Sequence, residues 1–374
     1  MQNAKQLISI LLVLLLIIAN TEVLAKSTDL KVLMVVSGYG QQQGKEAPGY
    51  EFDEFAKAYL VFKHNNLLVD IASPQGGPVE ADRYDPSKLY NQEVLTDPSI
   101  MAKLDNTLST AQLTADDYAG VFIVGGKGAM FDLPKDTSLQ QIIADIYQQQ
   151  GIVAAVCHGP AALVDVKLAD GSYLVANKAV NGFTNQEENL FGTKWMKDFA
   201  FMLEDKLVER GGKFQSSDIM LEHVAVEERL ITGQNPSSTV VVATELVKSL
   251  GIKPKPLASY EDDRTLGLIA QLLGGDLNAV QALKNAPDQY NIKFVGMYGY
   301  QYLEKAKSQQ EYQHALTLMT LAQVAMNNPK LEVQIAKAQH KIGDKHAAAD
   351  TLNKILATKP DFKPALDMLS TLSL

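Results

Sequence analysis

Short apolar runs that alternate with helical stretches between residues 30 and 251 constrain the fold of this chain more than any other feature. The runs are nearly continuous in Val, Ile, Leu and Ala, as strands are when helices cover both faces of their sheet. The intervening segments, such as 54–66 and 138–151, space their apolar residues as helices do. The runs lie at 30–37, 67–73, 118–126, 152–159, 178–183 and 223–233. This alternation predicts an α/β fold with a mostly parallel sheet sandwiched by helices.

The character of the sequence changes after residue 252. Segment 253–263 begins KPKPL, and its two prolines stop the preceding helix and favour an extended linker. From residue 264 to residue 374 we find no convincing strand pattern. Stretches 311–329 and 343–360 align at Ala315 and Ala348 with a spacing close to that of a tetratricopeptide repeat. We therefore expect an all-α tetratricopeptide-like domain at 264–374, with a plain helical bundle as the alternative.

The first 25 residues have the pattern of a secretory signal peptide. Lys5 provides a positive start, Leu7 to Ala19 is almost entirely apolar, and Val23 and Ala25 are small residues at cleavage positions. The apolar run is shorter than the roughly 18–20 residues that span a bilayer, so cleavage after Ala25 is favoured over a membrane anchor. We expect a chain secreted across the inner membrane into the periplasm, with a catalytic domain at 28–252.

Charge and cysteine content narrow the function classes. The formal net charge is −9, and no basic patch is visible, so we expect no nucleic-acid partner. The predicted α/β segment holds only His64, His158 and His223, with no pair at ligand spacing, so we expect no metal site. Cys157 is the only cysteine. In an oxidising compartment a lone thiol is either buried and inert or reactive.

Cys157 lies in AAVCHGPAA at 154–162, between an apolar strand and a small-residue helix predicted at 159–166. This places it at the carboxyl end of a parallel strand, where open α/β sheets bind ligands. A helix N-terminus at this point favours thiolate over thiol. The strand, sharp turn and helix resemble the nucleophile elbow of α/β hydrolases, with sulfur in place of oxygen. The alternative is that Cys157 is a small buried apolar residue.

A nucleophilic cysteine needs a base and a group that orients the base. His158 follows Cys157 directly, and on an elbow its ring can lie beside the sulfur. Glu187 and Glu188 follow the next predicted strand and are the candidate carboxylates. For both, the alternative is a solvated acidic start of a helix, where Glu is common.

The stretch AAVCHGPAALVDVKLADGSYLVANKAVNGFTNQEE resembles the PfpI (DJ-one) superfamily of class I glutamine amidotransferase-like proteins. The branch it resembles contains glutathione-independent glyoxalases and related heat-shock chaperones. Further similar motifs follow in the same order as in that branch, and the resemblance covers about residues 30 to 250. They are ASPQGG at 72–77, VGGKGAMFDLP at 124–134, LEDKLVERGGKF at 203–214 and LITGQNPSS at 230–238. The resemblance implies a flavodoxin-like sheet.

The resemblance also implies roles for single residues. Cys157 matches the nucleophile and His158 the adjacent base. The third member of the triad matches Glu188 rather than Glu187. A glutamate on the first helix, which hydrogen-bonds the sulfur, matches Glu54. Backbone amides of Gly126 and His158 are implied as the oxyanion hole.

Some positions differ from the branch or compete with these assignments. Asp53 and Glu51 are rivals of Glu54 on the first helix. Lys127 stands where the branch usually has histidine, and Lys57 replaces another usual histidine. We expect both lysines to border the active-site mouth, where they bear on substrate preference.

The resemblance implies an enzyme. We expect an exported cysteine-dependent lyase (a hydro-lyase) that converts 2-oxoaldehydes such as methylglyoxal to 2-hydroxy acids such as lactate. The reaction needs no cofactor: neither glutathione, nicotinamide nor metal takes part. The alternative is a holding chaperone or redox-responsive interaction protein that binds a protein or peptide through the helical tail, and a cysteine peptidase is less favoured. A homodimer is expected at the level of the superfamily.

Overall fold

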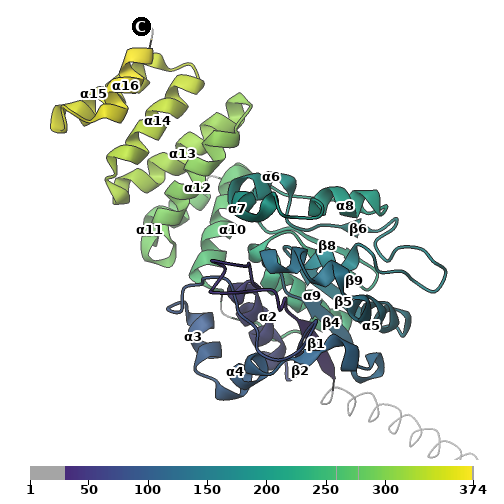
Figure 1. Cartoon of the computed structure of the whole chain (residues 1–374). Coiled ribbons are helices and arrows are strands. Elements are labelled where there is room, and N and C mark those ends of the chain that lie inside the picture. The colour runs from purple at the N-terminus through teal and green to yellow at the C-terminus, as the bar shows by residue number, and fades with distance from the viewer. Residues whose placement is uncertain (1–29, 258, 277, 373–374) are drawn as a thin grey trace, which may run out of the picture. The chain divides into compact units, whose positions relative to one another are not determined.

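The computed structural model describes residues 30–257, 259–276 and 278–372 (Figure 1). They form two compact units, and the boundary falls between Leu257 and Ala258, inside the segment predicted as a linker. The predicted signal peptide at 1–25 lies outside the described residues and stays a prediction. None of the described helices is long and apolar enough to cross a membrane.

The first unit is built on a seven-stranded sheet of order β3-β2-β1-β4-β5-β9-β8. All neighbouring pairs are parallel except β8 and β9, which are antiparallel. The strands are β1 Lys31–Val35, β2 Leu68–Ser73, β3 Leu108–Ser109, β4 Gly120–Ile123, β5 Ile152–Val156, β8 Val224–Glu227 and β9 Leu230–Gly233. This is the flavodoxin-like, mostly parallel sheet that the sequence predicts.

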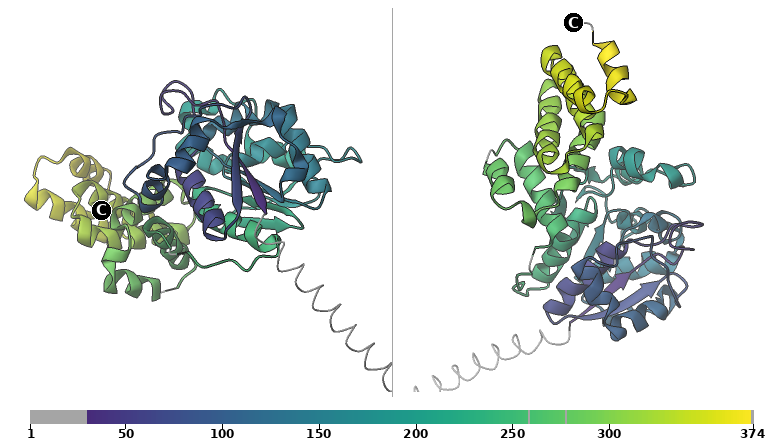
Figure 2. Two further views of the ribbon diagram at one scale, coloured as in Figure 1. Left: turned by 90° about the horizontal axis from the view of Figure 1, so that it is seen from below. Right: turned by 90° about the vertical axis from the view of Figure 1, so that its left-hand side faces the viewer.

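Helices cover both faces of this sheet (Figures 1 and 2). The chain moves from β1 to β2 in one direction along the sheet and from β4 to β5 in the other. Because crossovers between parallel strands are right-handed, α2 and α5 lie on opposite faces. The helices of this unit are α2 Phe52–His64, α3 Leu89–Leu95, α4 Pro98–Asp105, α5 Thr137–Gln148, α6 Asn185–Glu187, α7 Thr193–Met196, α8 Leu203–Glu209 and α9 Thr239–Ser249.

The central strands are buried along their length, which explains their continuous apolar sequence. Every residue of β4 and β5 is buried, and Phe122 on β4 meets Phe62 of α2 edge to face, with 5.5 Å between ring centroids. Strand order reverses between β1 and β4, so the carboxyl ends of these strands leave a crevice between them. In open α/β sheets such a crevice is where ligands bind.

Two of the predicted strand segments differ from the expectation. Segment 223–233 forms a hairpin, because Glu228 adopts a left-handed φ of 55° and turns the chain between β8 and β9. Segment 178–183 contributes only β6 Ala179–Val180, which pairs with β7 Lys213–Phe214 in a separate two-stranded sheet. Asn181 then links the chain to the main sheet: its backbone N–H donates to Thr232 Oγ1 on β9 at 2.9 Å.

The described residues of the second unit contain helices and no strand. Consecutive helices from α12 to α16 pack against one another. Ala315 and Ala348, the two positions aligned in the proposed repeat, are both fully buried. The helices are α10 Glu261–Leu273, α11 Asn278–Asn285, α12 Ile292–Lys305, α13 Gln309–Met326, α14 Pro329–Lys341, α15 Lys345–Thr358 and α16 Lys363–Thr371. The all-α character matches the prediction, and the tetratricopeptide assignment stays a prediction.

Candidate active site

The turn after β5 holds Cys157 in a left-handed conformation, with φ of 60°. Its backbone is fixed on both sides, since the Cys157 N–H donates to Gly233 O at 2.9 Å and its carbonyl accepts from the Phe183 N–H at 2.8 Å. A β-carbon on Gly159 would lie 2.4 Å from Ile123 O, so only glycine fits there. Strained backbone of this kind is typical of nucleophile elbows.

The structure places Cys157, His158 and Glu188 in one chain of contacts. The Cys157 sulfur lies 3.3 Å from His158 Nδ1, and His158 Nε2 lies 2.7 Å from Glu188 Oε2. All three side chains are buried. A carboxylate only accepts hydrogen bonds, so His158 donates from Nε2 and leaves Nδ1 free to accept the thiol proton. The arrangement can therefore deprotonate the thiol.

Glu187 and Glu188, the two rival carboxylates, have separate surroundings. Glu187 Oε1 accepts from Met220 N, Gln234 Nε2 and Asn235 Nδ2 at 2.7–3.0 Å. Its Oε2 accepts from the backbone and hydroxyl of Thr184, which closes a capping box at the start of α6. Glu187 thus holds the short helix α6 in place. Glu188, the next residue, contacts His158.

Room for the Glu188 carboxyl comes from Gly192. Residues 188–192 form a π-helical turn, and a β-carbon on Gly192 would lie 1.5 Å from Glu188 Oε1. The φ of Gly192 is −101°, so the requirement is for space and not for backbone freedom. Nothing in the residue pattern of 188–192 identifies this glycine, because its importance depends on where the carboxyl lies.

Glu54 on α2 is fully buried beside the thiol. Its Oε2 accepts the Gly125 N–H at 2.7 Å. Its Oε1 has no hydrogen-bond partner among the described residues. Burial, and then the neighbouring Glu51, raise the pKa of Glu54 well above its usual range. Glu54 is therefore neutral at moderate pH and can donate toward the Cys157 sulfur.

The rivals of Glu54 on this helix have other surroundings. Asp53 accepts from Lys88 Nζ, Tyr90 Oη and Asn91 Nδ2, on the side of α2 that faces α3. Only a minor part of Glu51 is exposed. The burial of its carboxyl and the nearby Asp53 charge together raise its pKa to about 7. Neither side chain has the contact with Gly125 that places Glu54 at the thiol.

The helix expected to favour a Cys157 thiolate is shorter than predicted. The predicted helix at 159–166 is a 3-10 helix of five residues, Gly159–Leu163, which is too short to supply the expected field. Burial raises the pKa of the Cys157 thiol, and the Glu54 carboxyl beside it acts in the same direction. Lys127 opposes these effects with its positive charge. Burial and the Glu54 carboxyl thus favour the protonated thiol, and His158 Nδ1 lies within reach of its proton.

The predicted oxyanion-hole residues lie on two neighbouring turns. Gly126 has φ of 95°, and a β-carbon there would lie 2.4 Å from Glu51 N. Gly125 directly before it is so close to Cys157 that an added β-carbon would lie 2.7 Å from Cys157 Cβ. The amides of Gly126 and His158 donate to no protein acceptor in the described part of the chain. Both amides remain available for a substrate oxygen.

The two lysines that depart from the family pattern lie in different places. Lys127 begins the 3-10 helix Lys127–Met130, and its charge acts on Cys157, Glu51 and Asp82. Lys57 is only 4% exposed, and its ammonium lies 4.8 Å from the centroid of the Tyr90 ring. Lys57 therefore packs against α3, and the expectation that it borders the mouth is wrong.

Sequence reasoning missed an aromatic cluster beside His158. Phe131 stacks on Tyr39 with 4.6 Å between centroids and meets Trp195 and Phe199 edge to face. Phe199 lies 6.3 Å from the His158 ring. These rings come from three separate segments, so no local motif connects them.

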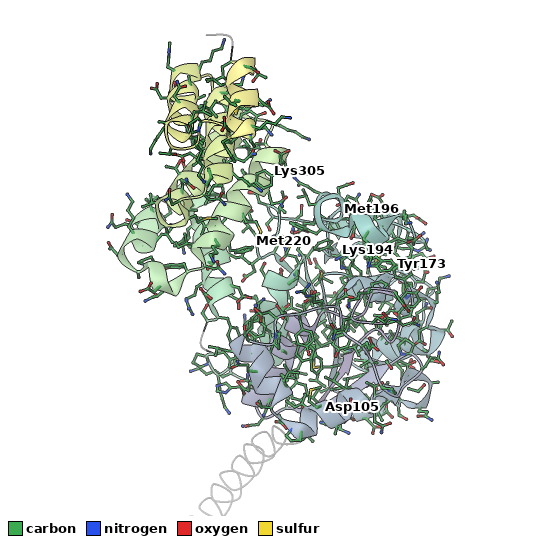
Figure 3. The ribbon with its side chains drawn as sticks, turned by 60° about the vertical axis from the view of Figure 1, so that its left-hand side comes forward. Asp105, Tyr173, Lys194, Met196, Met220 and Lys305 are labelled. Carbon is green, nitrogen blue, oxygen red and sulfur yellow. The ribbon has the colours of Figure 1, made fainter. Side chains whose placement is uncertain are left out.

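A lysine on α7 fastens that helix to a distant loop. Lys194 Nζ donates to the carbonyls of Gly44 and Lys45 at 2.9 and 3.0 Å. Figure 3 shows Lys194 beside Met196 on this segment. Cys157 itself is 3% exposed, so little of the thiol is open to solvent.

Comparisons with known proteins identify relatives in sequence and in fold. The glutathione-independent glyoxalase hsp3102 of Schizosaccharomyces pombe is 30% identical over 232 residues, which cover 59% of this chain and 96% of that protein. Rapid Encystment Protein 24 KDa of Francisella tularensis is 31% identical with a TM-score of 0.55, covering 59% of this chain and 99% of that one. Glyoxalase III of Candida albicans shares the fold, with 24% identity, a TM-score of 0.55, and coverage of 59% and 97%.

The match to a protein family covers a much longer part of the chain than any single motif does. The sequence model of the DJ-1/PfpI family matches residues 46–249, which include β2, β4, β5, the elbow and both turns of the oxyanion region. The match ends before the second unit begins. The chain belongs to the DJ-1/PfpI family.

Proposed function

We propose that this protein is a glutathione-independent glyoxalase-type lyase that converts 2-oxoaldehydes to 2-hydroxy acids. The observation that carries the proposal is the contact chain from the Cys157 sulfur through His158 to Glu188. Relatives about 30% identical over almost their whole length are named glutathione-independent glyoxalases, which supports the same reaction class.

The first step is addition of the thiol to the aldehyde carbon. His158 Nδ1 takes the thiol proton as the sulfur–carbon bond forms, and Glu188 stabilises the resulting imidazolium. The aldehyde oxygen becomes the oxyanion of a hemithioacetal. The free amides of Gly126 and His158 are placed to stabilise it, an effect worth about 3 kcal/mol per donor.

The second step moves hydrogen between two carbons. His158 first returns the thiol proton to the oxyanion, which gives a neutral hemithioacetal and a free Nδ1. It then removes the proton from the former aldehyde carbon to give an enediolate and returns a proton from Nδ1 to the neighbouring carbon, while the hydroxyl proton on the first oxygen passes to the second. The product is a 2-hydroxyacyl thioester on Cys157. Water then cleaves the thioester, releasing the 2-hydroxy acid and restoring the thiol. The neutral Glu54 carboxyl donates toward the sulfur through these steps.

The experiment is a measurement of lactate formed from methylglyoxal in the absence of glutathione. We expect steady turnover by the intact protein and a loss of about 10³-fold or more for Cys157→Ala. Asp116→Asn, at an exposed carboxylate far from the thiol in sequence, is the control. Turnover that survives in Cys157→Ala would refute the proposal.

The helical second unit supports an additional role, the binding of another protein or of a peptide. A groove of about 840 Å³ lies along α13, α14 and α15, lined by amide, hydroxyl and charged side chains such as Gln323, Gln339 and Lys354. Stacked helical repeats use such surfaces to bind peptides. We therefore retain a protein or peptide partner of the helical unit as a proposal, tested by comparing partner capture before and after removal of residues 258–374.

A further inference from the structure

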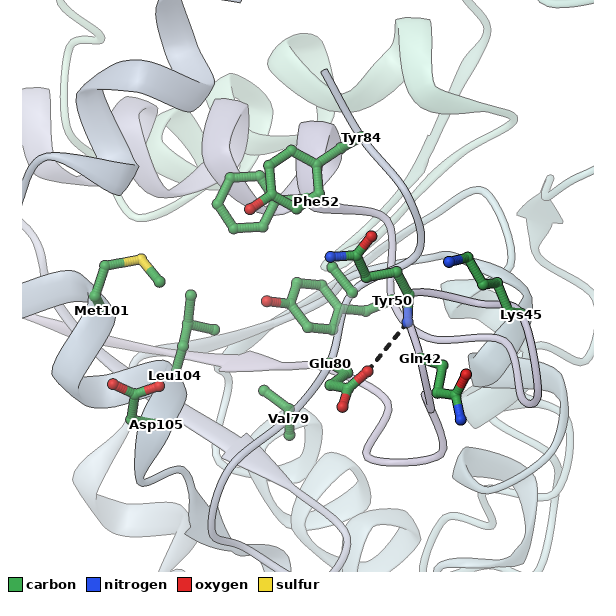
Figure 4. A pocket seen from close by; sticks show the side chains of 12 residues that line it. Gln42, Lys45, Tyr50, Phe52, Val79, Glu80, Tyr84, Met101, Leu104 and Asp105 are labelled. Atoms are coloured by element: carbon green, nitrogen blue, oxygen red, sulfur yellow. Dashed lines mark hydrogen bonds between the residues drawn. The ribbon is translucent and has the colours of Figure 1, made fainter. Parts of the chain in front are cut away.

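A pocket of about 500 Å³ lies in the first unit, apart from the thiol site (Figure 4). None of Cys157, His158, Glu188 and Glu54 lines it. Its walls come from the loop before α2, the segment before Tyr84 and the end of α4. The lining residues are Gln42, Gln43, Lys45, Tyr50, Phe52, Val79, Glu80, Ala81, Tyr84, Met101, Leu104 and Asp105. Its volume is in the range of pockets that hold small molecules.

One side of the pocket is aromatic and apolar. The rings of Phe52 and Tyr84 stack, with centroids 4.1 Å apart and planes 15° apart, and Tyr50 lies 6.4 Å from Phe52. Met101 and Leu104 of α4 face these rings (Figure 4). Aromatic faces and a thioether attract organic cations as well as apolar groups.

Tyr50 gives this pocket a polar group that lacks a partner. The residue is only 2% exposed, and its hydroxyl makes no hydrogen bond to any described residue. Figure 4 shows the hydroxyl pointing into the space between Tyr84 and Leu104. Burial, and then Tyr84 and Asp105, raise the pKa of Tyr50 far above its usual range, so the hydroxyl stays neutral. Its oxygen is not among the fully buried unpaired atoms and so keeps contact with the pocket space, where a ligand with a donor group can pair with it.

Two carboxylates give the pocket its charge. Asp105 at the end of α4 has no ion-pair partner among the described residues, and Glu80 accepts only the Gln43 N–H, at 3.1 Å. Lys45 is the one cation of the lining, and it lies on the side of Gln42, away from Asp105 (Figure 4). The end of the pocket near Asp105 and Tyr50 therefore favours positive charge.

We propose that this pocket binds a small aliphatic ammonium ion, with its charged group between Asp105 and the Tyr50 hydroxyl and its alkyl part against Tyr84 and Met101. An ammonium group supplies donors both to a neutral hydroxyl oxygen and to a carboxylate. A carboxylate or phosphate ligand would face two like charges, and an uncharged alkyl group would leave the Tyr50 hydroxyl unpaired. This site is additional to the proposed lyase activity and does not depend on it.

The probe is n-butylammonium, added to the full chain labelled with carbon-13 at the methionine methyl groups. Met101 lines the pocket, and its methyl resonance is assigned by its disappearance in Met101→Leu. We expect n-butylammonium to shift this resonance saturably, whereas butyrate leaves it in place and n-butanol shifts it much more weakly. Equal shifts with n-butanol, or no shift with n-butylammonium, would overturn the proposal.

Two variants locate the charged group. Asp105→Asn removes an exposed charge and should weaken n-butylammonium binding about fivefold. Tyr50→Phe removes only the unpartnered hydroxyl, so the fold is retained and binding should weaken about threefold. Asp116→Asn, an exposed carboxylate outside the pocket, is the matched control and should bind as the unmodified chain does. Unchanged affinity in both Asp105→Asn and Tyr50→Phe, or an equal loss in the control, would overturn the assignment.

Discussion

At the scale of single residues, the site depends on which of two adjacent glutamates performs each task. Glu188 contacts His158, whereas Glu187 accepts five hydrogen bonds from the elements around it. One carboxylate therefore acts on the imidazole, and the other holds the local structure. The roles of the two residues can be tested separately, because a Gln substitution removes the charge of either side chain with little change in its size.

We predict that Glu188→Gln lowers turnover of methylglyoxal by about 10²-fold while the melting temperature stays close to that of the unmodified chain. Glu187→Gln should instead destabilise the fold by about 2 kcal/mol, because an amide nitrogen cannot accept the hydrogen bonds that a carboxylate oxygen accepts. Thermal unfolding and lactate assays on both variants provide the measurement. If Glu187→Gln were the catalytic defect and Glu188→Gln the unstable variant, the assignment would be reversed.

The buried Glu54 predicts a pH dependence of stability. Its pKa is raised in the folded protein, so the folded state keeps a proton that the unfolded chain releases near pH 4.5. The stabilising contribution is complete below that pH and is lost as pH rises toward the folded pKa. Glu54→Gln has no such proton. We predict that the melting temperature of Glu54→Gln, relative to the unmodified chain, rises between pH 4.5 and pH 7.

Trp195, the only tryptophan, lies in the first unit and reports its unfolding by fluorescence. A difference in melting temperature between the two proteins that is independent of pH would show that Glu54 has an ordinary pKa. Its proposed role as a neutral donor to the sulfur would then fail.

At the residue scale, the sequence pattern and the family resemblance together pointed to Cys157, His158, Glu188 and Glu54, and the structure brings these residues close to one another. The contacts of Cys157 with His158 follow from their adjacency on a tight turn. The raised pKa of the thiol was not predictable, because it depends on burial and on a carboxyl 103 positions earlier in the chain. Lys57 was misplaced because the resemblance put its position at the active-site mouth, whereas its ammonium packs on Tyr90.

At the scale of elements, the π-helical turn 188–192 determines where the Glu188 carboxyl lies. A side chain on Gly192 would overlap that carboxyl, and the flexible Glu188 side chain would move more easily than the backbone. We predict that Gly192→Ala folds normally and loses about 10²-fold in turnover, comparable to Glu188→Gln. The double variant should lose little more than either single one.

Gly267→Ala is the control for this prediction, since a β-carbon at that position on helix α10 meets no atom within 4 Å and its backbone is helical. Additive losses in the double variant would mean that Gly192 acts by another route than Glu188. Full activity in Gly192→Ala would show that the turn tolerates the side chain.

The buried strands were predictable because burial on both faces requires continuous apolar sequence, as β4 and β5 show. The sequence did not divide segment 223–233 into the two strands β8 and β9, since the turn between them is made by Glu228 and Arg229 and contains none of the usual turn residues. The two-residue strands β3 and β7 carry too little pattern to be detected, and β6 was expected as part of a longer strand at 178–183.

At the scale of the whole molecule, the chain consists of a family domain followed by a helical unit. The sheet is complete before Leu257, and the family match ends at residue 249. We predict that a chain ending at Leu257 stays soluble and keeps the lactate-forming activity within about twofold, because its core lies within its own unit. Activity assays and circular dichroism on the truncated chain provide the measurement. A well-folded truncated chain without activity would show that the helical unit is needed for catalysis.

The central claim is that Cys157 and His158 carry a 2-oxoaldehyde through an enediolate to a 2-hydroxy acid. The most direct measurement is proton NMR of methylglyoxal incubated with the protein in D2O without glutathione. The account predicts lactate carrying solvent deuterium at its second carbon, formed by the unmodified chain and not by Cys157→Ala. Lactate formed at the same rate by Cys157→Ala, or methylglyoxal left unconsumed by the unmodified chain, would contradict it.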